Sequence, residues 1–202
     1  MAITLPIHGQ LLWDTPLDLA LRHLASAGFL PNDHGYLNWS QDPASSTAGA
    51  NPGTGSVRMV KLPTLPLTYT ITNVIAFVST AGAGLVAGQN FAGVYDSAGT
   101  RVGVTADQTA AWATTGLKSM ALTAPYVVAA NATVYLAMLY NGTSMSLACS
   151  SSVAGQNDLI NANLSTSVAR YTLGPNAQTS LPASITMAAR SLSSQATWMA
   201  AS

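Results

Sequence analysis

The sequence predicts a mostly β protein: an antiparallel β-sandwich or jelly-roll domain preceded by an N-terminal arm and one short α-helix. Three observations support this fold class. Short runs rich in β-branched and aromatic residues recur from Val57 onward, turn-forming residues separate these runs, and helical periodicity is almost absent after Gly28. A parallel α/β fold would need crossover helices between its strands, and the sequence has no pattern for them. We therefore expect one main core in the 202 residues.

Residues 1–28 are predicted to form an extended arm followed by one helix. Thr15 is a favourable N-cap, and Pro16 suits the first helical position. Gly28 supplies the left-handed residue that ends many helices. The helix is therefore expected to run from Pro16 to Ala27.

The predicted helix carries a narrow apolar stripe at helical spacing. A helix of this length is marginal alone in water, so the stripe must pack against another surface, and a second copy of the chain is a natural candidate. We expect this segment to serve oligomerisation and attachment through Trp13, Thr15, Pro16, Leu17, Leu21 and Leu24.

The rest of the chain divides into a linker and one β domain. Residues 29–56 are rich in Pro, Gly, Asn, Ser and Asp, which favours a linker, and residues 57–202 are predicted to form the β-sandwich domain. The expected strands are Val57–Val60, Tyr69–Val78, Phe91–Tyr95, Arg101–Thr105, Lys118–Leu122, Thr133–Tyr140, Met145–Cys149, Ser184–Ala189 and Ala196–Met199.

Two turns are predicted to join neighbouring strands as hairpins. Asp96–Gly99 and Asn141-Gly142 hold the residue types that such turns favour. The most apolar stretch, Ile71–Gly88, mixes Val, Ile and Phe with Thr, Ser and Asn. It falls short of the roughly 20 apolar residues that a membrane span requires. We predict a strand, a turn and a second strand there.

Charged residues are unusually scarce. Seven Lys and Arg balance seven acidic residues, all of them Asp, and the isoelectric point is near 6.8. Ordinary soluble domains are about a quarter charged, and neutral surfaces promote association. The chain is therefore expected to bury part of its exterior against copies of itself or other proteins. The basic residues are scattered, so we expect neither nucleic acid nor an anionic membrane surface as a partner.

The sequence offers little for catalysis, and we expect no enzyme activity, no cofactor and no bound metal. The three histidines, His8, His23 and His34, lack the spacing of zinc ligands. Cys149 is the single cysteine and is expected to be a small buried residue. No nucleophile elbow and no phosphate-binding glycine loop occurs.

Asp96 and Asp107 are the one close pair of acids in the predicted β domain. A glycoside hydrolase needs two carboxyl groups near each other, so this pair is the candidate for a carbohydrate-active module. We favour turn residues for both, because Asp is frequent in turns for its local backbone hydrogen bonds.

Aromatic residues in the predicted strands could contact a partner or stack on a sugar. The competing interpretation, which carries more weight, places most of them in the core or in an interface, because aromatic residues dominate β cores. The candidates for surface recognition are Tyr95, Trp112 and Tyr140.

Two stretches resemble known proteins. The segment Trp13–Leu21 resembles a short segment near the start of many bacteriophage tail and fibre proteins. Gly88–Thr100, followed by Thr105-Ala106-Asp107 and Trp112, is similar to a β domain that recurs in minor structural proteins of phages. The likeness extends through Ala121–Pro125 and Tyr135–Gly142.

The resemblance implies a non-catalytic virion component. Such proteins assemble in the cytoplasm of the bacterial host as oligomers, usually trimers, whose N-terminal part attaches to other structural proteins of the particle. Their β domain projects outward. We therefore expect a tail-associated protein: a minor tail protein, a fibre or a receptor-binding tip. No secretory signal is expected, because the N-terminus lacks a basic region and has Pro6.

Two alternatives stay open at this point. The same sandwich could belong to a capsid decoration or head fibre protein that binds the shell through its N-terminal arm. A reading from another class is a lectin or carbohydrate-active module whose aromatic residues face a host surface glycan or receptor.

Overall fold

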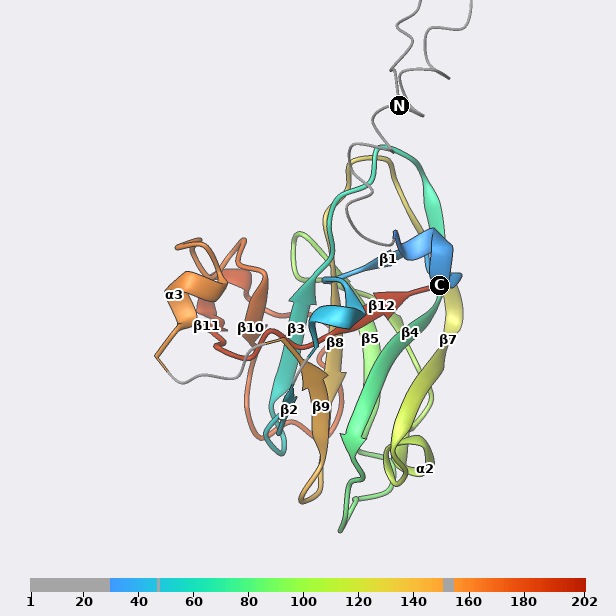
Figure 1. Ribbon diagram of the computed structural model, residues 1–202, viewed down its shortest axis with the longest axis vertical. Helices are drawn as coiled ribbons and strands as arrows, with labels where there is room; N and C mark the ends of the chain where they lie inside the picture. The colour runs from blue at the N-terminus through green and yellow to red at the C-terminus, as the bar shows by residue number, and fades with distance from the viewer. Residues whose placement is uncertain (1–29, 47, 151–154) are drawn as a thin grey trace, which may run out of the picture.

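The computed structural model describes residues 30–46, 48–150 and 155–202, which form two antiparallel β-sheets (Figure 1). Strands account for 41% of the chain and helices for 11%, and one of the sheets curls into a half-barrel. These proportions and the two sheets confirm the predicted mostly β, sandwich-like fold. The predicted arm and helix fall outside the described residues.

The first sheet, sheet A, is organised around the long strand β4. Its strands run in the order β1, β12, β4, β9 and β2, and β7 pairs with β4 over most of its length. Their bounds are Asn38–Trp39 for β1, Met199–Ala201 for β12, Tyr69–Thr80 for β4, Ser146–Cys149 for β9, Ala48–Ala50 for β2 and Gly116–Val128 for β7.

Strands β1 and β2 correct the linker that was predicted for residues 29–56. Asn38 and Trp39 pair with Ala201 and Ala200 of β12, and residues 48–50 pair with β9. Segments of two and three residues carry no periodic pattern, so composition alone suggested a loop. This part of the chain therefore belongs to the β-sandwich.

The second sheet, sheet B, has the strand order β11, β10, β3, β8, β5 and β6. An isolated bridge between Thr105, just after β6, and Leu122 of β7 links the edges of the two sheets. The bounds of its strands are Ser191–Leu192 for β11, Tyr171–Leu173 for β10, Val57–Lys61 for β3, Val134–Leu139 for β8, Phe91–Asp96 for β5 and Arg101–Val104 for β6.

The helices of the described residues are single turns that connect strands. Figure 1 shows α3 beside β10 and β11, and α2 near the start of β7. No helix in this part of the chain has the length and hydropathy to cross a membrane. The helical segments are Thr109–Trp112 (α2), Asn157–Ile160 (α3) and the 3₁₀ turns Pro31–His34 (η1), Pro43–Ser45 (η2) and Met187–Ala189 (η3).

Three of the predicted elements differ from the structure. No second strand follows β4 before Gly88, where the chain makes one isolated bridge between Ala83 and Thr143. Asn141-Gly142 is not a tight hairpin, because β8 and β9 lie in different sheets. The segment Ser184–Ala189 contains η3 and a single bridge instead of a strand.

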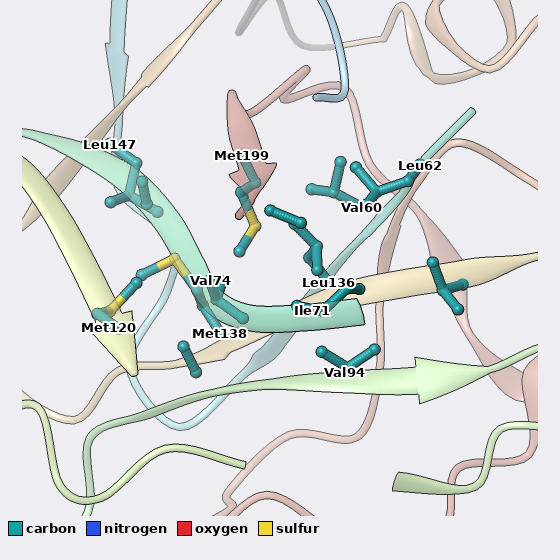
Figure 2. Packing of buried hydrophobic residues seen from close by; sticks show 14 of the residues in the cluster. Val60, Leu62, Ile71, Val74, Val94, Met120, Leu136, Met138, Leu147 and Met199 are labelled. Carbon is teal, nitrogen blue, oxygen red and sulfur yellow. The ribbon is translucent and has the colours of Figure 1, made fainter. Parts of the chain in front are cut away.

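The main core fills the space between the two sheets. Its side chains are almost completely buried, and Figure 2 shows them converging from β3, β4, β5, β7, β8, β9 and β12. Burying each such aliphatic side chain stabilises the fold by roughly 1.5–3 kcal/mol. The labelled residues are Val60, Leu62, Ile71, Val74, Val94, Met120, Leu136, Met138, Leu147 and Met199.

Strand β8 is buried on both faces. Leu136 and Met138 belong to the main core, whereas Tyr135, Ala137 and Leu139 belong to a second cluster. Leu181, Ile185 and Met187 complete that second cluster from the segment between β10 and β11. The continuous apolar run of β8, without alternation, is the pattern expected of a strand covered on both sides.

A buried guanidinium fastens this covering segment. Arg190 donates hydrogen bonds to the carbonyl oxygens of Met187 and Thr166 and to Oγ1 of Thr172, 2.9 Å away. Its Cζ lies 4.6 Å from the centre of the Tyr135 ring. Burial lowers the pKa of Arg190 from its usual value. The hydrogen bonds and the ring offset part of the cost of removing this charge from water.

The hairpin between β5 and β6 is confirmed, and its turn requires glycine. Gly99 has φ +87°, and a Cβ added there would lie 2.0 Å from the carbonyl oxygen of Ile185. We expect Gly99→Ala to destabilise the fold by about 3 kcal/mol, from the left-handed backbone and the clash together. Urea denaturation followed by tryptophan fluorescence measures this loss.

Gly88→Ala is the matched control for this substitution. Gly88 also has positive φ, +77°, but its added Cβ would meet no atom within 4 Å. It should therefore cost only about 1–2 kcal/mol. Equal losses in the two variants would contradict the role assigned to the contact with Ile185.

Candidate binding groove

The residues predicted for oligomerisation and attachment lie outside the described residues. These are Trp13, Thr15, Pro16, Leu17, Leu21 and Leu24. His8 and His23 fall in the same range. The candidate site described below lies within residues 30–46, 48–150 and 155–202.

The three aromatic residues predicted for surface recognition are buried, which corrects that prediction. Tyr95 and Trp112 are 0% exposed and Tyr140 is 1% exposed. The Tyr95 hydroxyl donates to the carbonyl oxygen of Pro182 at 2.7 Å, and the Trp112 indole donates to Sδ of Met120 at 3.3 Å. Burial raises the pKa of Tyr95 far above its usual value. The competing interpretation, that these rings are core residues, is confirmed.

Asp96 and Asp107 lie at opposite ends of β5. Asp96 ends the strand and accepts hydrogen bonds from the backbone of Ala98 and Thr100 in the turn. Asp107 accepts a hydrogen bond from the backbone of Asn90, the residue before the strand. Six residues of extended chain separate these positions by about 20 Å. That separation is about twice the largest one at which paired carboxyl groups cleave a glycosidic bond, so the predicted pair does not form.

Asp107 holds together the segment between Gly88 and Thr109. Burial favours a raised pKa for its carboxyl group, but hydrogen bonds from the Thr109 hydroxyl and from the backbone of Gly88, Asn90 and Thr109 lower the pKa overall. Asn90 is fully buried and donates to the carbonyl oxygen of Val86 and to Oγ1 of Thr109. These polar residues therefore fix the start of β5 against α2.

A groove lies on the outer face of sheet A, and we call it the aromatic groove. It has a volume of about 320 Å³. Phe77 of β4 and Leu117 of β7 are paired across the two strands, and they remain 41% and 53% exposed. Exposed apolar side chains that gather in one hollow mark a surface that binds something. The lining residues are His34, Tyr36, Pro43, Ser46, Phe77, Leu117, Ala148 and Trp198.

Ring contacts hold the aromatic groove in one shape. The ring of Tyr36 meets that of Trp198 edge-on, with centroids 5.9 Å apart, and the rings of His34 and Trp39 lie 5.5 Å apart. Trp198 donates its indole N–H to the carbonyl oxygen of Gln41 at 3.1 Å. The side chains that line the groove are therefore already ordered, so the binding of a partner would immobilise few of them.

The backbone around the groove is equally constrained. The turn η1 ends at Gly35, whose left-handed φ of +75° reverses the chain toward Tyr36. The backbone N–H groups of Leu37 and Ser40 donate to the carbonyl oxygens of Ala201 and Met199 on β12. Pairing with β12 thus places Tyr36 beside Trp198, although more than 150 residues separate them in the sequence.

The lining of the groove is mostly apolar, and His34 is one of its two ionisable residues. None of its other lining residues is ionisable except Tyr36. The Oγ of Ser46 is buried and has no hydrogen-bond partner. A buried hydroxyl without a partner costs about 1–3 kcal/mol, so Ser46 lowers the stability of the fold at this position.

A second hollow on the surface has the opposite character. Lys61 and Arg170 line it together with Ser40, Leu62, Pro63 and Thr64. Within the described ranges, no three His, Cys, Asp or Glu side chains converge in the way that a metal site requires. The hollow with Lys61 and Arg170 has cations that suit an anionic ligand, whereas the aromatic groove has no Lys or Arg in its lining.

Sequence reasoning missed the aromatic groove. His34, Tyr36 and Trp39 fall in the predicted linker, and Trp198 falls in the predicted strand Ala196–Met199. Phe77 and Leu117 fall on the outward positions of alternating strands, which was the one available signal. Nothing in the sequence indicated that these positions meet.

No protein-family model matches the chain, and no curated protein matches it in sequence.

We expect Asp107→Asn to destabilise the protein at neutral pH, because the lowered pKa means that the folded state favours the ionised carboxylate. This contribution is present above the pKa of the unfolded chain, about 3.9, and is lost as the pH falls through the lower folded value. The gap in urea midpoint between the variant and the parent should therefore narrow below about pH 4. A gap of constant size from pH 7 to pH 3 would show that charge plays no part.

Proposed function

We propose that this protein is a non-catalytic structural component of a bacteriophage particle, associated with the tail. In this proposal it assembles as an oligomer, a trimer by analogy with similar proteins, through its N-terminal segment. The β-sandwich then faces neighbouring virion proteins or the host surface. The protein would be made in the host cytoplasm and carry out its role on the virion.

The observation that carries this proposal is the scarcity of charge on the outside of the β-sandwich. Of the eleven charged residues in the described ranges, Arg58 and Arg190 are buried, which leaves nine at the surface. Arg58 donates to Oγ of Ser193 and to the carbonyl oxygen of Pro52, and burial lowers its pKa to about 10. A surface with so few ions favours contact with other molecules over solitary solubility.

Exposed apolar side chains support the same proposal. Besides those of the aromatic groove, Leu67 is 70% exposed and Val127 is 59% exposed. Such residues are normal when scattered singly, but on a nearly uncharged surface they add to the area that association would cover.

The segments that resemble phage proteins support it in a second way. Their polar residues Asn90, Thr105 and Asp107 are engaged in hydrogen bonds within the fold. Because these residues stabilise the fold, a likeness at their positions does not require a catalytic activity in common with the phage proteins. This is the relationship expected among structural proteins.

Fractionation of purified particles tests the location. We expect the protein in the tail fraction, detected by mass spectrometry after heads and tails are separated. Recovery in the heads would favour the capsid decoration or head fibre alternative and would end the tail assignment. Absence from both fractions would overturn the proposal as a whole.

The apolar stripe predicted for the N-terminal segment can be tested with purified protein. Replacing Leu17, Leu21 and Leu24 by Ser should dissociate the oligomer, because these side chains are expected to form its apolar seam. Sedimentation velocity measures the mass. Leu159→Ser is the matched control, since Leu159 is 75% exposed on α3 and its replacement should leave the mass unchanged. An unaltered mass in the triple variant would contradict the prediction.

A further inference from the structure

We propose that the hollow around Lys61 and Arg170, which we call the cationic hollow, binds one oxyanion group, a phosphate or a carboxylate, of a small ligand. Its volume is about 330 Å³, at the small end of the range of about 300–1,000 Å³ that ligand pockets occupy. The site would bind such a ligand whether or not the protein is found on virions, so the two proposals can fail separately.

The cations at the surface of the β-sandwich are few, and two of them lie in this hollow. Six Lys and Arg fall in the described ranges, and Arg58 and Arg190 among them are buried, which leaves four at the surface. Lys61 and Arg170 are two of these four, and both line the cationic hollow. The hollow therefore holds half of the positive charge that the described surface carries.

The other two surface cations are used within the fold. Arg101 donates a hydrogen bond to the carbonyl oxygen of Leu181. Lys118 donates to Oγ1 of Thr114 at 2.7 Å. Neither residue lines the cationic hollow, so the pair that remains is the one placed to meet an anion from solution.

Lys61 and Arg170 lie opposite each other on neighbouring segments. The register that pairs Val60 of β3 with Tyr171 of β10 continues to these residues, and the backbone N–H of Lys61 donates to the carbonyl oxygen of Arg170 at 2.7 Å. Like charges directly opposite each other destabilise a sheet. An anion bound between the two side chains would remove this repulsion.

The lining offers these cations no counter-ion of its own. Among the described residues, no Asp lines the cationic hollow. Asp42, the acid nearest in sequence to the lining residue Ser40, accepts a hydrogen bond from the backbone N–H of Ala44 at 2.8 Å and caps η2. The positive charge of the hollow is therefore available to a ligand.

A buried ring holds Arg170 in place. Its Cζ lies 5.5 Å from the centre of the Tyr171 ring, which is 2% exposed. The Tyr171 hydroxyl donates to Oε1 of Gln41 at 2.9 Å, which fixes the ring. A guanidinium above a ring still presents N–H groups at its edge, in a planar fork that matches two oxygens of a phosphate or a carboxylate.

The segment after Lys61 adds a neutral donor. Thr64 is exposed and lines the cationic hollow, and its hydroxyl can donate to an oxyanion. Nδ2 of Asn38 donates to the carbonyl oxygen of Pro63 at 2.6 Å, which fixes the chain next to Thr64. The ligand therefore meets three donor groups that are already positioned.

Two cations suit one anionic group rather than a polyanion. Nucleic acids and anionic membrane surfaces bind through many cations that act together. The hollow has two, and a single phosphate or carboxylate group needs no more for charge-assisted hydrogen bonds.

The experiment is a titration of ¹⁵N-labelled protein, followed by NMR, with inorganic phosphate, methyl glucuronide and methyl glucoside. The buffer has low ionic strength, because salt screens exposed charges. We expect phosphate, glucuronide or both to shift the amide signals of Lys61, Thr64 and Arg170 saturably, with a Kd of about 1–10 mM. Methyl glucoside lacks the carboxylate and should leave these signals unchanged.

The two anions distinguish the sources of the oxyanion. Saturable binding of phosphate alone would assign the site to phosphate groups, and binding of glucuronide alone would assign it to carboxylates. Binding of both would show that the hollow recognises the oxyanion whatever carries it. Each of these outcomes supports the proposal.

Variants assign the binding to the hollow. Lys61→Gln and Arg170→Gln, tested separately, should each weaken binding about tenfold, because each removes one of the two charges. Lys118→Gln is the matched control: it removes the same charge from the surface outside the hollow and should bind like the parent.

The stability of Lys61→Gln separates a binding role from a structural one. Its urea midpoint without ligand should equal or exceed that of the parent, because the substitution removes a repulsion between opposite residues. The anion that binds should raise the midpoint of the parent by mass action and leave that of the variant unchanged. A lower midpoint together with unchanged affinity would assign Lys61 to the fold.

Three results would overturn the proposal. They are the lack of a saturable shift with both anions, an equal response to methyl glucoside, and a loss of affinity in Lys118→Gln as large as that in Lys61→Gln. The last would mean that the net charge of the molecule, and not the cationic hollow, attracts the anion.

Discussion

The pairing of β12 between β1 and β4 is the interaction on which the rest of this structure depends. Ala200 of β12 lies opposite both Trp39 and Ile75, so this one short strand joins the beginning of the described chain to the centre of sheet A. The strand also places Met199 in the main core and, on the other face, leaves Trp198 beneath the aromatic groove. Both the sandwich and its candidate site require this register, because a slip of one residue would exchange the two faces.

Strand β7 shows how much of the fold the sequence could predict and where it could not. The run Lys118–Leu122 marked the strand, but the structure extends it from Gly116 to Val128. Backbone pairing with β4 is interrupted between Ala121 and Tyr126, where Pro125 lacks an amide hydrogen, and resumes as far as Tyr69 and Val128. Local composition located the strand, whereas its length depends on a partner distant in the sequence.

The aromatic residues show the same limit at the level of the site. Aromatic residues occur both in recognition sites and in cores, so residue type alone could not place Tyr95, Trp112 and Tyr140. Their burial in the structure shows that they are core residues. Burial is set by the tertiary fold: the segment around Leu181 covers Tyr95, and α2 packs Trp112 against the main core. The groove is instead lined by Tyr36 and Phe77. The alternating pattern within one strand could not predict that these two residues lie close together.

The scarcity of ions on the β-sandwich also determines how this molecule responds to its surroundings. Dissolved salt weakens attraction between exposed charges and acts much less on apolar and hydrogen-bonded contacts. Contacts made through the exposed side chains of Phe77 and Leu117 are therefore expected to change little with salt concentration. A surface with so few ions makes contacts that depend little on ionic strength.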